Sequence, residues 1–177
     1  MKKNVSFTGH RPSKFSFGYN ENSVECIKLK ALLINEIEKL YLLGYKTFLT
    51  GCAMGVDMWG AEIVLDLKKK FDDIKLFCIM PFENQCERWQ EDYKKRFNYI
   101  VENCNQKIIL QKEYDSDCYF KRNKFLVKHS TVIISVYDEK HSNSGTKNTL
   151  NYALSLNKNI ILINPNLLKV FNIKNTL

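Results

Sequence analysis

Short apolar runs alternate with longer amphipathic runs along most of this chain. The short runs are four to six residues long and mostly rich in Val, Ile, Leu and Phe, which is typical of strands buried on both faces of a sheet. Six such strands are predicted, at residues 4–8, 46–50, 75–80, 107–110, 131–136 and 159–163.

The longer runs predict helices because their apolar residues recur at spacings of three and four. Gly44 supplies a C-terminal stop for the first helix. Strand and helix alternate throughout, which predicts an α/β fold, a single Rossmann-like three-layer domain over residues 1–177 with a mainly parallel sheet. The helical ranges are 22–43, 56–70, 84–103, 117–129 and 146–157, and the apolar stripe of the first is Val24, Ile27, Ala31, Ile34, Ile37 and Tyr41.

Composition narrows the class of protein. The 177 residues are 45% hydrophobic and 26% charged, an ordinary globular balance, and no segment approaches the ~20 apolar residues of a membrane span. The N-terminus does not resemble a signal peptide, so we expect a cytoplasmic protein with no membrane partner.

The six cysteines are scattered without a CxxC pair, which predicts reduced, mostly buried thiols and no metal site.

The formal net charge is +8, from 27 basic and 19 acidic residues. Such a surplus favours polyanionic partners, either nucleic acid or a small phosphorylated ligand. The lysines are dispersed along the chain, however, which is equally typical of solvated helix faces.

Ligands of open parallel sheets bind beyond the carboxyl ends of the strands. The first predicted strand ends in Thr8, Gly9, His10 and Arg11. Glycine permits a close backbone turn, and the planar fork of Arg11 suits phosphate or carboxylate. His10 is either structural or a hydrogen-bond donor to a ligand oxygen.

The second predicted strand leads into Gly51-Cys52-Ala53-Met54-Gly55, directly before a helix. Two glycines at a helix start leave backbone N–H groups that attract anions, although the spacing matches neither GxGxxG nor GxxxxGK[ST]. Asp57 in the first helical turn is either a helix cap or a ligand for a ribose hydroxyl. Glu62, one turn further on, is a weaker candidate.

Three later segments also carry candidate residues. Trp89, after the third strand, is more typical of a core residue than of a base-stacking one. Arg122 and Asn123 lie in the helical segment before the fifth strand. After that strand, Ser144-Gly145-Thr146 begins a helix and forms either a second anion site or a plain N-cap.

Five motifs in order, TGHRP, TGCAMGVDMWGAE, MPF, YFKRNKFLV and SGTKNTLNYA, resemble the YpsA-like family of the SLOG superfamily, over roughly residues 4–163. That superfamily includes the DNA-processing protein DprA and the LOG-type phosphoribohydrolases. The resemblance implies a Rossmann-like fold that binds nucleotides or nucleotide-derived ligands, such as ADP-ribose relatives, between its two glycine-bearing loops.

The resemblance also bears on catalysis. The arginine of the LOG-type hydrolases matches Arg122, but Thr149 stands at the position of their glutamate. Threonine cannot steady an oxocarbenium-like charge or activate water. Hydrolysis is therefore not expected unless Glu62, Asp57 or Asp138 substitutes, and the catalytic candidates are Glu62, Asp57 and Arg122.

We therefore predict a protein that binds a nucleotide-derived small molecule as a sensor, regulator or sequestering module, without a cofactor, and that forms a homo-oligomer. The alternatives are a nucleoside-phosphate hydrolase with a displaced carboxylate, and single-strand nucleic-acid binding as in DprA, with Phe15, Phe17 and Tyr19 stacking on bases. The predicted ligand-binding residues are Thr8, Gly9, His10, Arg11, Gly51, Cys52, Gly55, Asp57, Arg122, Asn123, Ser144, Gly145 and Thr146.

Overall fold

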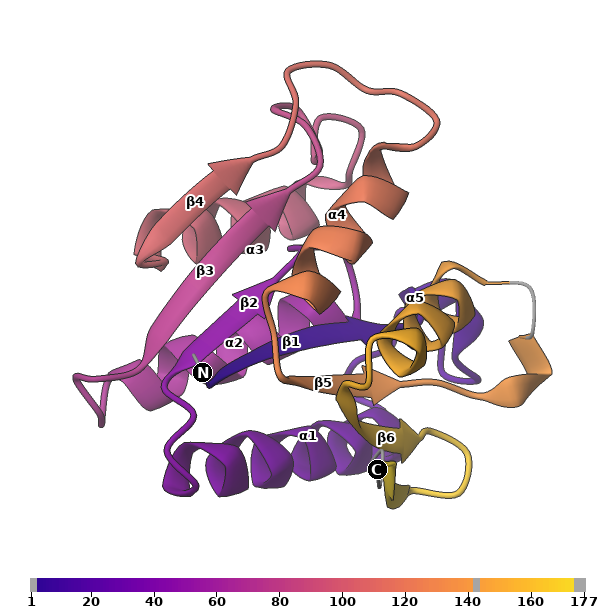
Figure 1. Ribbon diagram of the computed structural model, residues 1–177. Coiled ribbons are helices and arrows are strands. Elements are labelled where there is room, and N and C mark those ends of the chain that lie inside the picture. Colours follow the sequence, from indigo (N-terminus) through magenta and orange to yellow (C-terminus); the bar gives the residue numbers. More distant parts are fainter. Residues whose placement is uncertain (1–2, 142–143, 174–177) are drawn as a thin grey trace.

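The computed structural model describes residues 3–141 and 144–173. Strands and helices alternate from β1 to β6, as the apolar pattern predicts, β7 follows β6 directly, and two short 3₁₀ turns follow β1 and β5 (Figure 1). The strands are β1 (Asn4–Gly9), β2 (Thr47–Thr50), β3 (Lys75–Met80), β4 (Gln106–Ile109), β5 (Val132–Val136), β6 (Asn159–Asn164) and β7 (Lys169–Ile173). The helices are α1 (Val24–Leu42), α2 (Val56–Lys68), α3 (Glu91–Asn103), α4 (Cys118–Lys128) and α5 (Gly145–Ser155), and the 3₁₀ turns are Pro12–Lys14 and Glu139–His141.

The strands form one sheet in the order β4-β3-β2-β1-β5-β6-β7. Every neighbouring pair is parallel except β6 and β7, which confirms the predicted mainly parallel sheet. β7 was not predicted from the sequence. Its residues, KVFNI, are mostly exposed, and an edge strand lacks the continuous apolar run that marks a strand buried on both faces.

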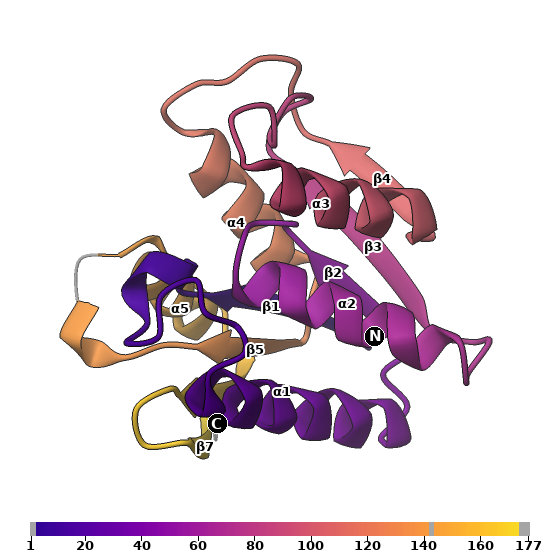
Figure 2. The ribbon, with the colours of Figure 1, turned by 180° about the vertical axis from the view of Figure 1, so that it is seen from behind.

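Helices cover both faces of the sheet, which confirms the Rossmann-like three-layer architecture. α1, α2 and α3 pack on one face, seen in front in Figure 2. α4 and α5 contact each other on the opposite face, in front in Figure 1. The core between the layers contains Phe7 of β1 and Phe48 of β2, whose rings stack 6.2 Å apart, and the fully buried Trp59 of α2.

Two helix predictions need correction. The range 84–103 is helical only from Glu91, because residues 82–89 form turns and Gln90 is the N-cap, with acidic residues in the first helical turn. In α1, most of the predicted apolar stripe is not buried: Val24 and Ile27 are 61% and 56% exposed, although Ile37 is fully buried. The face that packs on the core is a parallel stripe at similar spacing, formed by Cys26, Leu29, Leu33, Ile37 and Leu40.

All six cysteines are free, and four of them are buried, as predicted. The sheet order also locates the point where the topology reverses. The chain runs outward from β1 through β2 and β3 to β4, and α4 then returns it to β5 on the other side of β1. The crevice beyond the carboxyl ends of β1 and β5 is therefore where an open α/β sheet binds its ligand.

Candidate functional site

A cavity of about 280 Å³ opens at the switch point between β1 and β5. Its wall combines the loop after β1, the start of α2, the first half of α4 and the start of α5. Segments far apart in the sequence thus meet at one edge of the sheet. The lining residues are Thr8, Gly9, His10, Arg11, Lys14, Ala53, Asp57, Tyr119, Arg122, Asn123, Ser144, Gly145 and Thr146.

The loop after β1 is held to the loop after β5 by His10. The backbone N–H of Asp138 donates to Nε2 of His10 (3.1 Å), so this ring nitrogen is an acceptor and the imidazole is neutral. The ring is buried and packs against Phe15 and Tyr137, with centroids 6.0 and 5.3 Å away. His10 therefore fixes the spacing of the two loops that flank the crevice.

Arg11 presents its charge to the cavity. Its guanidinium carbon lies 5.8 Å from the ring centroid of Tyr119, within cation–π range. Among the described residues, no carboxylate lies within ion-pair distance of Arg11. An unneutralised arginine in a crevice is suited to an anionic ligand group.

The loop between β2 and α2 supports the cavity wall, although most of its residues do not line the cavity. A Cβ at Gly55, whose φ is +91°, would lie 2.7 Å from the carbonyl oxygen of His10, so glycine lets the two loops approach. Cys52 has a φ of 54°, and its backbone N–H donates to Oγ1 of Thr50 (3.0 Å). Gly51, Cys52 and Gly55 do not line the cavity, in contrast to the other predicted binding residues.

Gly51 makes room for a buried ion pair. A Cβ there would lie 1.4 Å from Nη1 of Arg122 and 2.6 Å from Oδ2 of Asp57. Nη1 of Arg122 lies 3.2 Å from Oδ2 of Asp57, and the two side chains are only 5% and 8% exposed. The structure thus gives Asp57 a role as the partner of Arg122, which neither the cap nor the ribose interpretation includes.

Burial shifts the pKa of both members of this pair. It raises the pKa of Asp57, while the charges of Arg122 and Arg11 and the nearby backbone N–H groups of Ala53 and Gly51 act in the opposite direction. It lowers the pKa of Arg122, against the attraction of Asp57. The pair is stable only because each charge offsets the desolvation of the other.

A chain of hydrogen bonds links Arg122 to α5. Its Nε donates to Oδ1 of Asn123 (2.9 Å), and Nδ2 of Asn123 donates to Oγ1 of Thr149 (3.0 Å). The Thr149 hydroxyl in turn donates to the carbonyl oxygen of Gly145 (2.8 Å). Thr149, at the position where the LOG-type hydrolases carry glutamate, therefore connects α4 to the first turn of α5.

The N-terminus of α5 forms the remaining wall. Ser144 is the N-cap, and its hydroxyl accepts from the N–H of Lys147 (3.2 Å). The N–H groups of Gly145 and Thr146 precede the first hydrogen bond inside the helix, from Asn148 N to Ser144 O. Donors in this position, together with the helix dipole, favour an anion. Ser142 and Asn143 of the predicted polar loop lie outside the described residues.

Arg11, Lys14 and Arg122 face one carboxylate, Asp57, in the described lining, so the cavity carries a surplus of positive charge. Lys14 and Tyr119 were not singled out from the sequence. Lys14 follows Arg11 by three residues in a 3₁₀ turn, and Tyr119 lies in the first turn of α4. The one available signal was their place in segments that follow strands.

The other candidate carboxylates lie elsewhere. Both oxygens of Glu62 accept from Arg96, at 2.7 Å from Nε and 2.8 Å from Nη2. Asp138 accepts from the side-chain amide of Asn166 and from the N–H of Lys140. Neither residue lines the cavity.

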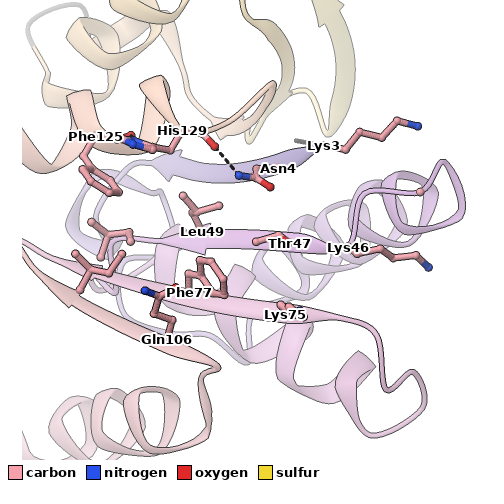
Figure 3. Close-up of a pocket in the computed structure, with 13 residues that line it drawn as sticks. Lys3, Asn4, Lys46, Thr47, Leu49, Lys75, Phe77, Gln106, Phe125 and His129 are labelled. Atoms are coloured by element: carbon pink, nitrogen blue, oxygen red, sulfur yellow. Dashed lines mark hydrogen bonds between the residues drawn. The ribbon is translucent and has the colours of Figure 1, made fainter. Parts of the chain in front are cut away.

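A cavity of about 510 Å³ lies at the opposite edge, where the strands begin (Figure 3). Its floor is apolar and includes Leu49 and Phe77, whereas Lys3 and Lys46 extend away from it. Its lining includes polar residues such as Asn4, Thr47 and Gln106, but these are the first residues of their strands, so the cavity lies at the amino ends, opposite the edge where open parallel sheets bind ligands. The smaller cavity, at the carboxyl edge of the sheet, is therefore the candidate functional site.

The described residues contain neither a helix suited to crossing a membrane nor a metal-binding cluster. Within residues 3–141 and 144–173, no helix combines the length and the apolar character that crossing a bilayer requires. Over the same part of the chain, His, Cys, Asp and Glu side chains form no group of three or more that could hold a metal ion.

Comparison with known proteins points to one group. The family model described as "YspA SLOG family" matches residues 5–168. A UPF0398 protein of Bacillus cereus strain ATCC 14579 is 32% identical over 148 residues, covering 80% of this chain and 78% of the relative. UPF0398 proteins of Bacillus cereus strain B4264 and Bacillus thuringiensis strain Al Hakam are 31% and 30% identical, with the same coverage. The matched range contains every residue of the cavity wall.

Proposed function

This chain belongs to the YpsA family (YspA SLOG family), and on that premise we propose that it binds a nucleotide or nucleotide-derived ligand at the carboxyl edge of the sheet. The ligand class is a ribose phosphate or an ADP-ribose-like compound. The protein acts as a sensor, regulator or sequestering module for that ligand. One observation carries the proposal: Arg11, Lys14, Arg122 and the start of α5 converge on one cavity of about 280 Å³.

Each part of the cavity has a role in the proposed complex. Arg11 and Lys14 neutralise the phosphate, and the N–H groups of Gly145 and Thr146 donate to its oxygens. Arg122 is already paired with Asp57, so it contributes less net charge and holds the wall in place. Gly145, where even a Cβ would meet no atom within 4 Å, leaves room for the ligand close to the backbone, whereas the missing side chain of Gly9 makes room for Val56.

Thermal unfolding in the presence of ribose 5-phosphate, AMP and ADP-ribose tests this proposal. A ligand at a hundred times its Kd stabilises the folded state by ~2.7 kcal/mol, which corresponds to a rise in Tm of about 5–10 °C for a chain of this size. Arg11→Gln should abolish the rise. Lys28→Gln, which removes the same charge from the exposed face of α1, should leave it intact. No rise with any of the three compounds would remove the proposal.

Hydrolysis is a second candidate because one carboxylate, Asp57, does line the described part of the cavity. Its pairing with Arg122 supports binding without cleavage, since a carboxylate held by a buried arginine is not free to activate water. Chromatography of AMP incubated with the protein decides between the two. Release of adenine that Asp57→Asn abolishes would identify a hydrolase, whereas intact AMP supports a binding protein.

The aromatic residues that the nucleic-acid alternative requires to stack on bases pack against other aromatic rings of the protein. Phe15 and Phe17 stack on each other 5.0 Å apart, and both contact the ring of Trp59. Tyr19 packs edge-on against Tyr93, 6.1 Å away. These contacts support the small-ligand proposal over stacking of single-stranded bases on this loop.

A further inference from the structure

A second cleft, of about 390 Å³, adjoins the anion cavity at the same edge of the sheet. The turns after β3, the segment after β4 and the start of α4 enclose it. Tyr119 lines both the cleft and the anion cavity, and the guanidinium of Arg11 lies 5.8 Å from its ring. A single ligand can therefore place an anionic group beside Arg11 and extend past Tyr119 into the cleft.

Three aromatic rings form one side of this cleft. Phe82 lies edge-to-face with Tyr114 (5.6 Å) and with Tyr119 (6.1 Å), and the two tyrosines are 6.4 Å apart. None of these three contacts is a face-to-face stack, and Tyr114 is 65% exposed. Aromatic rings arranged in this way offer a stacking surface to a planar ligand group.

Gln85 supplies a polar group that lacks a partner within the described residues. The side chain is 4% exposed and lines the cleft. Its Nε2 donates to the carbonyl oxygens of Gly51 and Cys52, each at 3.1 Å. A carbonyl oxygen can only accept, so the NH₂ group of the Gln85 amide must face the two carbonyls, which fixes the orientation of the amide.

The oxygen of the same amide, Oε1, is buried and makes no hydrogen bond in the described part of the chain. Buried acceptors are nearly always satisfied in native proteins, so an unsatisfied one in the wall of a cleft indicates a missing donor. A planar ligand group that lies against the aromatic rings can supply this donor as an N–H group.

We propose that this cleft is a subsite for a nucleobase that carries an exocyclic amino group. The base stacks on Phe82 and Tyr114, its amino group donates to Oε1 of Gln85, and its ribose phosphate extends past Tyr119 to Arg11. This inference rests on the proposed function, because the phosphate must occupy the anion cavity. It adds that the base, and its amino group in particular, contributes to affinity.

Three ligands separate the contributions: ribose 5-phosphate, AMP, and purine riboside 5′-monophosphate, which is AMP without the amino group. We expect titration calorimetry to give AMP an affinity about tenfold above ribose 5-phosphate, as for one stacked base. Purine riboside 5′-monophosphate should bind several-fold more weakly than AMP, because it leaves Oε1 of Gln85 unpaired.

Tyr114→Ala tests the stacking surface without disturbing the core, because Tyr114 is largely exposed. The variant should lose most of the advantage of AMP while binding ribose 5-phosphate as the parent does. Tyr99→Ala removes a half-exposed tyrosine from α3, outside the cleft, and should bind both ligands normally.

The outcomes distinguish the two proposals. If ribose 5-phosphate binds but AMP binds no more tightly, or if Tyr114→Ala leaves the ratio unchanged, the base subsite is wrong and the anion site stands. Equal binding of AMP and purine riboside 5′-monophosphate would refute the role of Gln85. If none of the three ligands binds, the proposed function fails and the subsite fails with it.

Discussion

Gly51→Ala should disrupt the buried ion pair between α2 and α4. The added Cβ would lie 1.4 Å from Nη1 of Arg122, about 2 Å short of ordinary contact, and 2.6 Å from Oδ2 of Asp57. A guanidinium at the end of an exposed side chain would swing aside at little cost. Arg122 is 5% exposed, and its Nε is bonded to Asn123, so it can move only by breaking these contacts.

The magnitude follows from the loss of the pair. Leaving a buried charge without its partner costs about 3–5 kcal/mol. Because Arg122 can shift toward the cavity that it lines, we take the lower end of that range, about 3 kcal/mol. For a chain of this size, that loss lowers Tm by roughly 6–12 °C.

The effect should depend on pH. Burial already raises the pKa of Asp57, and losing the Arg122 charge raises it further. A group whose pKa is raised in the folded state contributes less stability as the pH increases above its ordinary value, because the folded protein then holds a proton that the unfolded chain has lost. The deficit of Gly51→Ala should therefore be larger at pH 8 than at pH 5.

Urea denaturation at both pH values measures this deficit. Gly145→Ala is the matched control, because a Cβ there meets no atom within 4 Å, and it should change stability by less than about 1 kcal/mol. A Gly51→Ala variant as stable as the parent at both pH values would show that the Arg122–Asp57 pair can shift away from residue 51 at little cost. That result would refute the predicted destabilisation.

Three further perturbations test other contacts. Burial alone would raise the pKa of Glu21, but hydrogen bonds from Arg96 and Lys30 lower it to about 2, so this carboxylate contributes stability above about pH 4.5 that is lost as the pH falls toward 2. Glu21→Gln should thus cost about 1–2 kcal/mol at pH 7 in urea denaturation, and its difference from the parent should vanish in acid; a constant difference would contradict this. Gly60→Ala should destabilise by about 1–3 kcal/mol despite its better helix propensity, since the Cβ would lie 2.8 Å from the ring of Phe7; a stabilised variant in thermal unfolding would contradict this. Hydrogen bonding to Cys78 lowers the pKa of Cys104, so peptide mass spectrometry after brief iodoacetamide treatment at pH 7 should find Cys104 modified first, and equal labelling of all six cysteines would contradict it.

Much of the fold was predictable because a strand buried on both faces needs a run of apolar residues, and that run is visible in the sequence. The six parallel strands carry apolar runs, and their observed ends differ from the predicted ones by at most a residue. The exceptions are informative. β7 pairs only with β6 at the edge of the sheet, so it needs no apolar run. The predicted apolar stripe of α1 is mostly exposed because the helix carries two apolar stripes, and only tertiary packing decides which one is buried.

The grouping of the candidate residues at one edge of the sheet was predictable for the same reason. Thr8, Arg11 and the Ser144-Gly145-Thr146 segment follow strands, and parallel strands bring their carboxyl ends to one edge. Gly51 and Gly55 were predicted to bind the ligand, but they do not line the cavity; they give space to Arg122 and to the backbone of His10.

The sequence by itself thus determined the alternation of strands and helices, the edge where the candidate site is proposed and the family to which the chain belongs. These properties depend on residues close together in the chain or on motifs in a fixed order. Tertiary structure alone decided that Asp57 pairs with Arg122, and that Gln85 fixes its amide on the loop after β2. Each of these contacts joins residues more than thirty positions apart, and no local pattern of apolar and polar residues specifies the partner of a side chain at that separation.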